Sequence, residues 1–97
     1  MADGAFAREY GCTEAEWLRW LPGAVRDHML SLPAPGQARV AIGSGRLALR
    51  WTVLPPRRIA LVSLARMKVE FSFEGVDDAA RAAFLRYFDL YLQRGGG

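Results

Sequence analysis

The chain has 97 residues and a mass of 10.8 kDa, which is the size of one domain. Hydrophobic residues make up 52% and charged residues 24%, a globular composition that excludes a disordered chain. A single cysteine and a single histidine exclude an internal disulfide framework and a His/Cys zinc site built from one chain. No apolar run is long enough to span a membrane, and Met1–Arg8 shows no secretory signal, so we expect a cytoplasmic protein.

The N-terminal third predicts helices. Residues 1–12 carry scattered apolar side chains and indicate a helical turn or two in an otherwise flexible end. Thr13-Glu14-Ala15-Glu16 has the spacing of a capping box, and apolar residues follow it at helical spacing. Because proline is tolerated in the first turn of a helix and breaks its interior, we expect two short helices, over residues 14–21 and 23–31, that meet at Pro22.

After residue 36 the hydrophobic period changes to two, which predicts antiparallel strands. A Gly43-Ser44-Gly45 hairpin loop separates the alternating segments 37–42 and 46–53. Pro55-Pro56 predicts a turn, since neither residue can donate to a strand ladder. Residues 57–74 keep one alternating register without a turn-forming residue, so we expect one long strand bent near its middle, with two strands joined there as the alternative.

A long helix is expected after Gly75, capped by Asp77 or Asp78. Its apolar residues cover more than half of the circumference, whereas packing on one sheet needs a stripe only a little over ~100° wide. We therefore expect a second apolar contact, with the N-terminal helical region or with a second protomer. Residues 94–97 predict a flexible tail.

These elements predict a single α+β domain over residues 1–97. It combines short N-terminal helices, a three- to four-stranded antiparallel meander and a long C-terminal helix packed on one face of the sheet. Such a sheet has one buried and one exposed face. The alternation assigns the following side chains to the buried face: Val40, Ile42, Leu47, Leu49, Trp51, Val53, Ile59, Leu61, Met67, Val69, Phe71 and Phe73.

Positive charge is concentrated in the middle of the chain, where residues 28–69 hold seven Lys and Arg and no acid. The alternation places six of these bases together on the exposed face of the sheet: Arg39, Arg46, Arg50, Arg58, Arg66 and Lys68. Such a face is a candidate site for an anionic ligand or an acidic partner. The alternative is a solvated charged face that keeps the sheet soluble. The predicted face carries no aromatic side chain on which bases could stack, which argues against single-stranded nucleic acid.

We therefore expect a non-catalytic binding or adaptor domain. It would contact another protein or an anionic partner through the Arg-rich face and the apolar C-terminal helix, as a homodimer or docked on a larger protein. No sequence pattern predicts a metal site, a phosphate loop or another cofactor site.

A small-molecule binder or a small enzyme is the alternative function. Its pocket would lie between helix and sheet, among aromatic residues that otherwise form the core: Trp17, Trp51, Phe71, Phe84 and Phe88. Cys12, just before a predicted helix, and His28, the only histidine, are its candidate reactive groups. However, Asp27 points away from its neighbour His28 on a helix, and Glu14 and Glu16 oppose a thiolate at Cys12.

Overall fold

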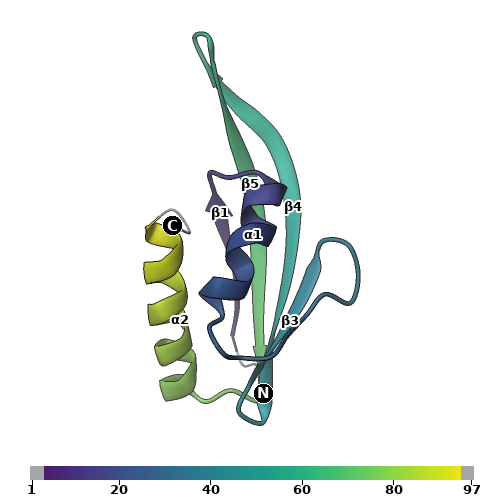
Figure 1. Cartoon of the computed structure of the whole chain (residues 1–97), viewed down its shortest axis with the longest axis vertical. Coiled ribbons are helices and arrows are strands. Elements are labelled where there is room, and N and C mark those ends of the chain that lie inside the picture. The colour runs from purple at the N-terminus through teal and green to yellow at the C-terminus, as the bar shows by residue number, and fades with distance from the viewer. Residues whose placement is uncertain (1–3, 95–97) are drawn as a thin grey trace.

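The computed structural model describes residues 4–94 and shows an α+β fold, as the sequence predicts. Five strands and two helices follow one another in this order: β1 (Ala5–Tyr10), α1 (Glu14–Ala24), β2 (Leu30–Ser31), β3 (Gln37–Ile42), β4 (Gly45–Ile59), β5 (Val62–Glu74) and α2 (Asp78–Gln93). All strand pairs are antiparallel, and the order across the sheet is β1-β5-β4-β3-β2. Both helices cover the same face of this sheet (Figure 1), so the opposite face is open.

Helix α1 begins at the predicted capping box. The Thr13 hydroxyl accepts a bond from the Glu16 amide at 3.1 Å, and the Glu16 carboxylate accepts one from the Thr13 amide at 2.9 Å. The prediction of two helices meeting at Pro22 is wrong, because Pro22 lies inside α1, near its end, where it removes only one helical hydrogen bond. Residues 23–31 form no second helix: Arg26 takes a left-handed φ of 59°, and β2 then pairs with β3.

The N-terminal segment is a strand, so the prediction of a helical turn there is wrong. Strand β1 pairs with β5 from Ala5 opposite Ser72 to Tyr10 opposite Met67, and forms one edge of the sheet. Its alternation is short but regular, with half-buried residues on the covered side and exposed residues on the open side. The expected flexibility of the two ends stays a prediction, since residues 1–3 and 95–97 lie outside the described part of the chain.

Strands β4 and β5 form a long hairpin where the sequence predicted a turn followed by one strand. The Pro55-Pro56 pair lies within β4, at a register shift between Leu54 and Arg57. The two prolines are tolerated because pairing between β3 and β4 stops at Arg50. Beyond that residue, no strand lies on this side of β4 to accept hydrogen bonds from its backbone N–H groups. The turn lies at residues 60–61, where Ala60 takes a left-handed φ of 53°. Alanine rarely adopts this conformation, so the sequence did not predict a turn at this position. The sheet therefore has five strands, rather than three or four.

The far end of this hairpin, residues 54–66, projects beyond the rest of the sheet (Figure 1), and we call it the arm. It makes the molecule elongated, with extents of 47 × 26 × 23 Å. Three side chains that the alternation assigned to the buried face are exposed at the arm or its base: Val53 by 60%, Ile59 by 55% and Leu61 by 103%. The prediction is wrong for Ile59 because the register shift places it opposite Val62, on the other face. For Val53 and Leu61 it is wrong because neither helix extends far enough to cover this part of the hairpin.

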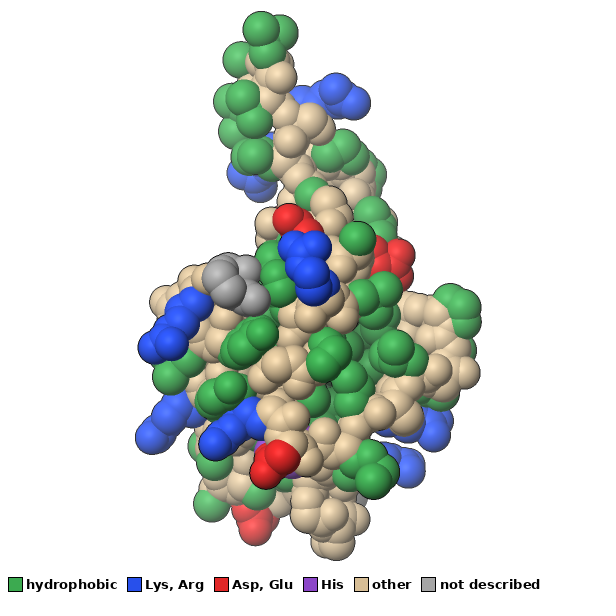
Figure 2. Space-filling view, in the orientation of Figure 1, with side chains coloured by type: hydrophobic (Ala, Val, Ile, Leu, Met, Phe, Trp, Pro, Cys, Tyr) green, Lys and Arg blue, Asp and Glu red, His purple; other side chains and the backbone are tan. Residues whose placement is uncertain are grey.

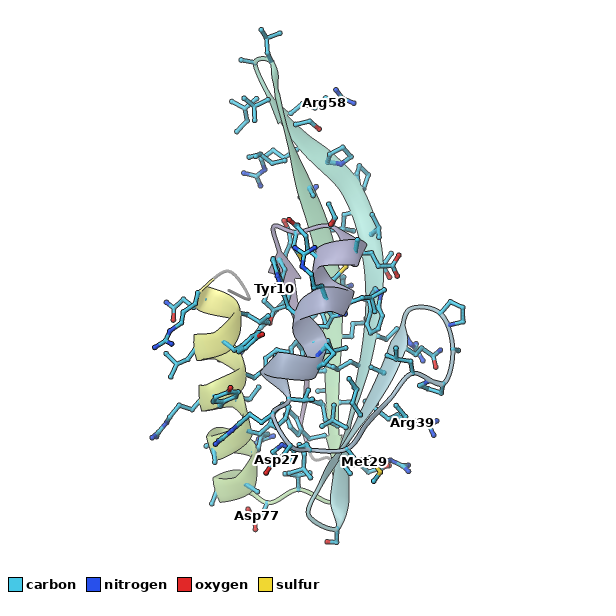
Figure 3. All side chains as sticks on the ribbon, in the orientation of Figure 1. Tyr10, Asp27, Met29, Arg39, Arg58 and Asp77 are labelled. Atoms are coloured by element: carbon cyan, nitrogen blue, oxygen red, sulfur yellow. The ribbon has the colours of Figure 1, made fainter. Side chains whose placement is uncertain are left out.

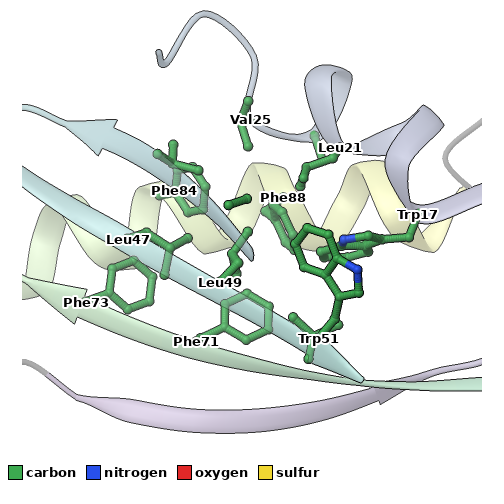
Figure 4. Packing of buried hydrophobic residues seen from close by; sticks show 14 of the residues in the cluster. Trp17, Leu21, Val25, Leu47, Leu49, Trp51, Phe71, Phe73, Phe84 and Phe88 are labelled. Atoms are coloured by element: carbon green, nitrogen blue, oxygen red, sulfur yellow. The ribbon is translucent and has the colours of Figure 1, made fainter. Parts of the chain in front are cut away.

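The core lies between the sheet and the two helices (Figure 4). Trp17 and Leu21 of α1 and Phe88 of α2 are at most 1% exposed. The two helices also touch each other: a side chain at Gly23 would collide with the Tyr91 ring, because the space for a Cβ lies 2.2 Å from its hydroxyl. The second apolar contact of α2 is therefore α1, which was one of the two predicted alternatives.

Candidate functional site

The pairing register determines which side chains reach the open face. Arg46 lies opposite Glu74, Arg50 opposite Glu70, and Arg39 opposite Ala48. Arg66 and Lys68 follow on the same face of β5, so five of the six predicted bases lie together. The sixth does not: the register shift between Leu54 and Arg57 places Arg58 opposite Ser63, on the other side of the hairpin.

Acidic neighbours neutralise three of these five bases. Arg66 donates two hydrogen bonds to the Glu9 carboxylate, at 2.9 and 3.1 Å. Arg46 forms an ion pair with Glu74 across the β4–β5 ladder. Lys68 lies 3.8 Å from Glu70 on its own strand. All of these pairs are substantially exposed, so each contributes little to stability but removes net charge from the surface.

Of these five bases, Arg39 and Arg50 form no ion pair with any residue between 4 and 94. They are diagonal neighbours on β3 and β4, since Arg39 lies opposite Ala48 and Arg50 lies opposite Gln37. Such diagonal positions are about 7–8 Å apart. Two planar guanidinium groups at this spacing can approach one carboxylate or one phosphate from two sides.

A hollow of about 520 Å³ lies beside these two arginines. Its floor is a row of small side chains that crosses three strands, Ala5 on β1, Ser72 on β5 and Ala48 on β4, and the row ends at Arg39. The adjacent row is taller and forms a wall: Ala7, Glu70, Arg50 and Gln37. The hollow exists because Ala5, Ser72 and Ala48, which adjoin across three strands, have small side chains. We call this feature the trough.

The β1 side of the trough was not foreseen from the sequence, neither Ala5 on its floor nor Ala7 on its wall. Ala5 and Ala7 come from β1, which the sequence analysis assigned to a helical turn in a flexible end. The same strand supplies Glu9, the acid that neutralises Arg66. The available signal was the alternation of Phe6, Arg8 and Tyr10 with small or acidic residues, which is too short to distinguish a strand from a helical turn without its partner strand.

The five aromatic residues of the predicted pocket belong to the core, and Phe84 also borders a hollow beside His28. Trp17, Phe71 and Phe88 are fully buried, and Trp51 and Phe84 are 6% and 5% exposed. Trp17 packs edge-on to Trp51 and to Phe88, and Phe71 packs edge-on to Phe88, at centroid distances of 5.6–6.2 Å, while Phe84 stacks on Phe88 at 5.6 Å (Figure 4). The aromatic residues therefore act as the core of the domain.

The candidate reactive groups lie apart from the trough. His28 borders a smaller hollow of about 240 Å³, with its Nδ1 atom 2.8 Å from the Val25 carbonyl oxygen and its ring edge-on to Phe84. Cys12 is 3% exposed. Burial, and secondarily the charge of Glu16, raises the pKa of the Cys12 thiol above its ordinary value, so the thiol is protonated at neutral pH.

Two kinds of feature are absent from residues 4–94. No group of three or more His, Cys, Asp or Glu side chains is placed to hold a metal ion there. Within the same range, neither helix has the length and apolar character needed to cross a membrane.

No protein-family model matches this sequence, and no curated protein matches it either.

Proposed function

We propose that the protein is a non-catalytic binding domain that holds an acidic peptide segment of another protein in the trough. The observation that carries this proposal is the pair of arginines, Arg39 and Arg50. They form no ion pair among the described residues and lie beside a floor of small side chains. Arginine suits such a role because its planar guanidinium group can donate two parallel hydrogen bonds to one carboxylate.

The dimensions of the trough suit an extended peptide. Neighbouring strands lie about 4.8 Å apart, so a row across four strands is about 15 Å long. Four or five residues of extended chain span that distance at ~3.3 Å per residue. The Ser72 hydroxyl and the Gln37 amide border the trough and can form hydrogen bonds with a peptide backbone. Within the described part of the chain, the open face carries no aromatic side chain, which disfavours a nucleobase as the ligand.

Helix α2 is not part of the proposed surface. Its Phe84 and Phe88 are buried, and Leu85, Tyr91 and Leu92 pack against the core. The apolar character that suggested a docking helix is therefore used within the domain.

Backbone NMR during titration with a short Glu-rich peptide tests the proposal. We expect shifts at the amides of Ala48, Ser72 and Arg50, and weaker binding as salt increases. The double variant Arg39→Gln/Arg50→Gln should lose at least tenfold in affinity, while the matched control Arg19→Gln, an exposed arginine of α1, should bind as the parent does.

A steric variant separates trough binding from general electrostatic attraction. Ala48→Leu keeps every charge but fills the floor, and should abolish the shifts while the domain stays folded, because Ala48 faces the open side. Peptide binding that survives Ala48→Leu, or that loses equally with Arg19→Gln, contradicts the proposal. Inorganic phosphate in a parallel titration shows whether a phosphate competes for the same two arginines.

A further inference from the structure

The end of the arm exposes large aliphatic side chains. Beyond the ends of β1 and β3, strands β4 and β5 pair only with each other. Leu61 is 103% exposed, Ile59 55%, Val62 54% and Leu64 45%. In the space-filling view these side chains form an apolar end on the projecting hairpin (Figure 2). A cluster of exposed aliphatic residues at the extremity of a small domain indicates a contact surface.

The register arranges this end in layers. The turn, Ala60 and Leu61, comes first, and the pair Ile59–Val62 follows it. The next two pairs carry the charges: Arg58 opposite Ser63, and Arg57 opposite Leu64. Since a strand rises about 3.3 Å per residue, the apolar end extends roughly 7–10 Å beyond the two arginines.

Positive charge lies on both faces of the hairpin just below this apolar end. Arg57 and Arg58 are consecutive strand residues, so they point to opposite faces of the hairpin. Figure 3 shows Arg58 directed away from the arm. Residues 28–69 contain no acid, and neither Arg57 nor Arg58 forms an ion pair with another residue in the described range.

We propose that the tip of the arm inserts into the interface of an anionic lipid bilayer. The apolar end formed by Ile59, Leu61 and Val62 enters the boundary between headgroups and acyl chains, which peripheral segments reach to a depth of about 5–10 Å. At that depth Arg57 and Arg58 lie at the level of the lipid phosphates, which attract them. The distance between the apolar end and the two arginines therefore matches the distance between the lipid phosphates and the depth that peripheral segments reach.

The placement of charge on both faces favours a bilayer over a protein groove. A bilayer presents phosphates all around an inserted tip, whereas the wall of a groove meets one face of a hairpin. A second copy of the chain is disfavoured for two reasons: the arms would bring four arginines together, and Pro55-Pro56 lacks the N–H groups that pairing along the β4 edge needs.

Vesicle flotation tests this inference. We expect the protein to float with vesicles of three parts phosphatidylcholine to one part phosphatidylserine, and to bind pure phosphatidylcholine vesicles at least tenfold more weakly. Leu61→Asp should reduce partitioning at least tenfold. Arg57→Gln/Arg58→Gln should reduce it roughly tenfold to thirtyfold, since each basic residue near an anionic surface contributes about fivefold. The matched control, Leu90→Asp, alters an aliphatic residue of α2 that is 49% exposed and lies away from the arm, and should float as the parent does.

A fluorescent probe at the tip distinguishes the possible occupants. In a Cys12→Ala background, Leu61→Cys labelled with an environment-sensitive dye should shift to the blue on addition of anionic vesicles and show no shift with protein concentration alone. Failure of the parent to float at low salt, or flotation unaffected by Leu61→Asp, overturns the inference. A concentration-dependent shift without lipid, accompanied by a dimer in light scattering, overturns it in favour of a second copy.

Discussion

Phe71 and Ser72 are adjacent in β5 but lie on opposite faces of the sheet, and they offer a direct test of the register. Phe71 is fully buried: its ring stacks on Phe6 at a centroid distance of 4.7 Å and meets Phe88 edge-on at 5.6 Å. The guanidinium of Arg8 lies 5.3 Å from the same ring. Ser72 is exposed on the floor of the trough.

The expected cost differs greatly between the two positions. Truncating a buried phenylalanine to alanine costs about 3–5 kcal/mol, and a domain of this size is stable by only about 5–15 kcal/mol. Phe71→Ala is therefore expected to be barely folded, so Phe71→Leu, with an expected cost of about 1–2 kcal/mol, is the more informative variant. Ser72→Ala removes one exposed hydroxyl and should change the free energy of unfolding by less than about 0.5 kcal/mol.

Urea denaturation, followed by circular dichroism and by the fluorescence of the buried Trp17 and Trp51, measures both effects. With an m-value of about 1–3 kcal/mol per molar urea, Phe71→Leu should lower the midpoint by roughly 0.3–2 M, and Ser72→Ala should lower it by much less. If Ser72→Ala costs as much as Phe71→Leu, or if Phe71→Leu costs nothing, the assignment of the two faces is wrong.

Three further predictions concern single side chains. Trp51 donates from Nε1 to the Glu14 carboxylate at 2.8 Å, so Glu14→Ala should cost about 1 kcal/mol in urea denaturation and alter the tryptophan emission; an unchanged midpoint argues against this bond. The hydrogen bonds from Arg66 hold the pKa of Glu9 below its ordinary value of 4.5, so this pair stabilises the fold above that pH and the stabilisation disappears as the pH falls through the lowered pKa. Glu9→Gln should therefore reduce the loss of stability between neutral pH and pH 3, and equal acid profiles would refute the assignment. Burial protects Cys12, so its thiol should react with a disulfide reagent at least a hundredfold more slowly in the native protein than in urea; rapid native labelling would show that it is accessible.

The features that were predicted correctly from the sequence depend on neighbours along the chain. The capping box at Thr13 and the hairpin loop at Gly43 need only a few consecutive residues. The alternation of residues 37–53 determined the face of each side chain there, including Arg39 and Arg50, because side chains in a strand alternate whatever lies on either side. Helix α2 and its cap at Asp77 followed from spacing in the same way.

The errors lie where the outcome depends on contacts between distant segments. Whether an alternating residue such as Val53 is buried depends on whether a helix extends far enough to cover it, and the helices stop short of the arm. Arg58 changed face because the register shift at Pro55-Pro56 puts one extra residue into β4 relative to β5, which no periodicity within β4 reveals.

The same distinction applies to the candidate site. The run of bases without acids in residues 28–69 is a property of the sequence alone. Its division into neutralised and unpaired arginines is not. The neutralising acid of Arg66 is Glu9, which is brought beside it by pairing between β1 and β5, the first and last strands along the chain. Local periodicity thus determined which face each side chain takes within an uninterrupted strand. The pairing of distant strands and the length of the helices determined which residues it contacts, because those contacts exist only once the whole chain has folded.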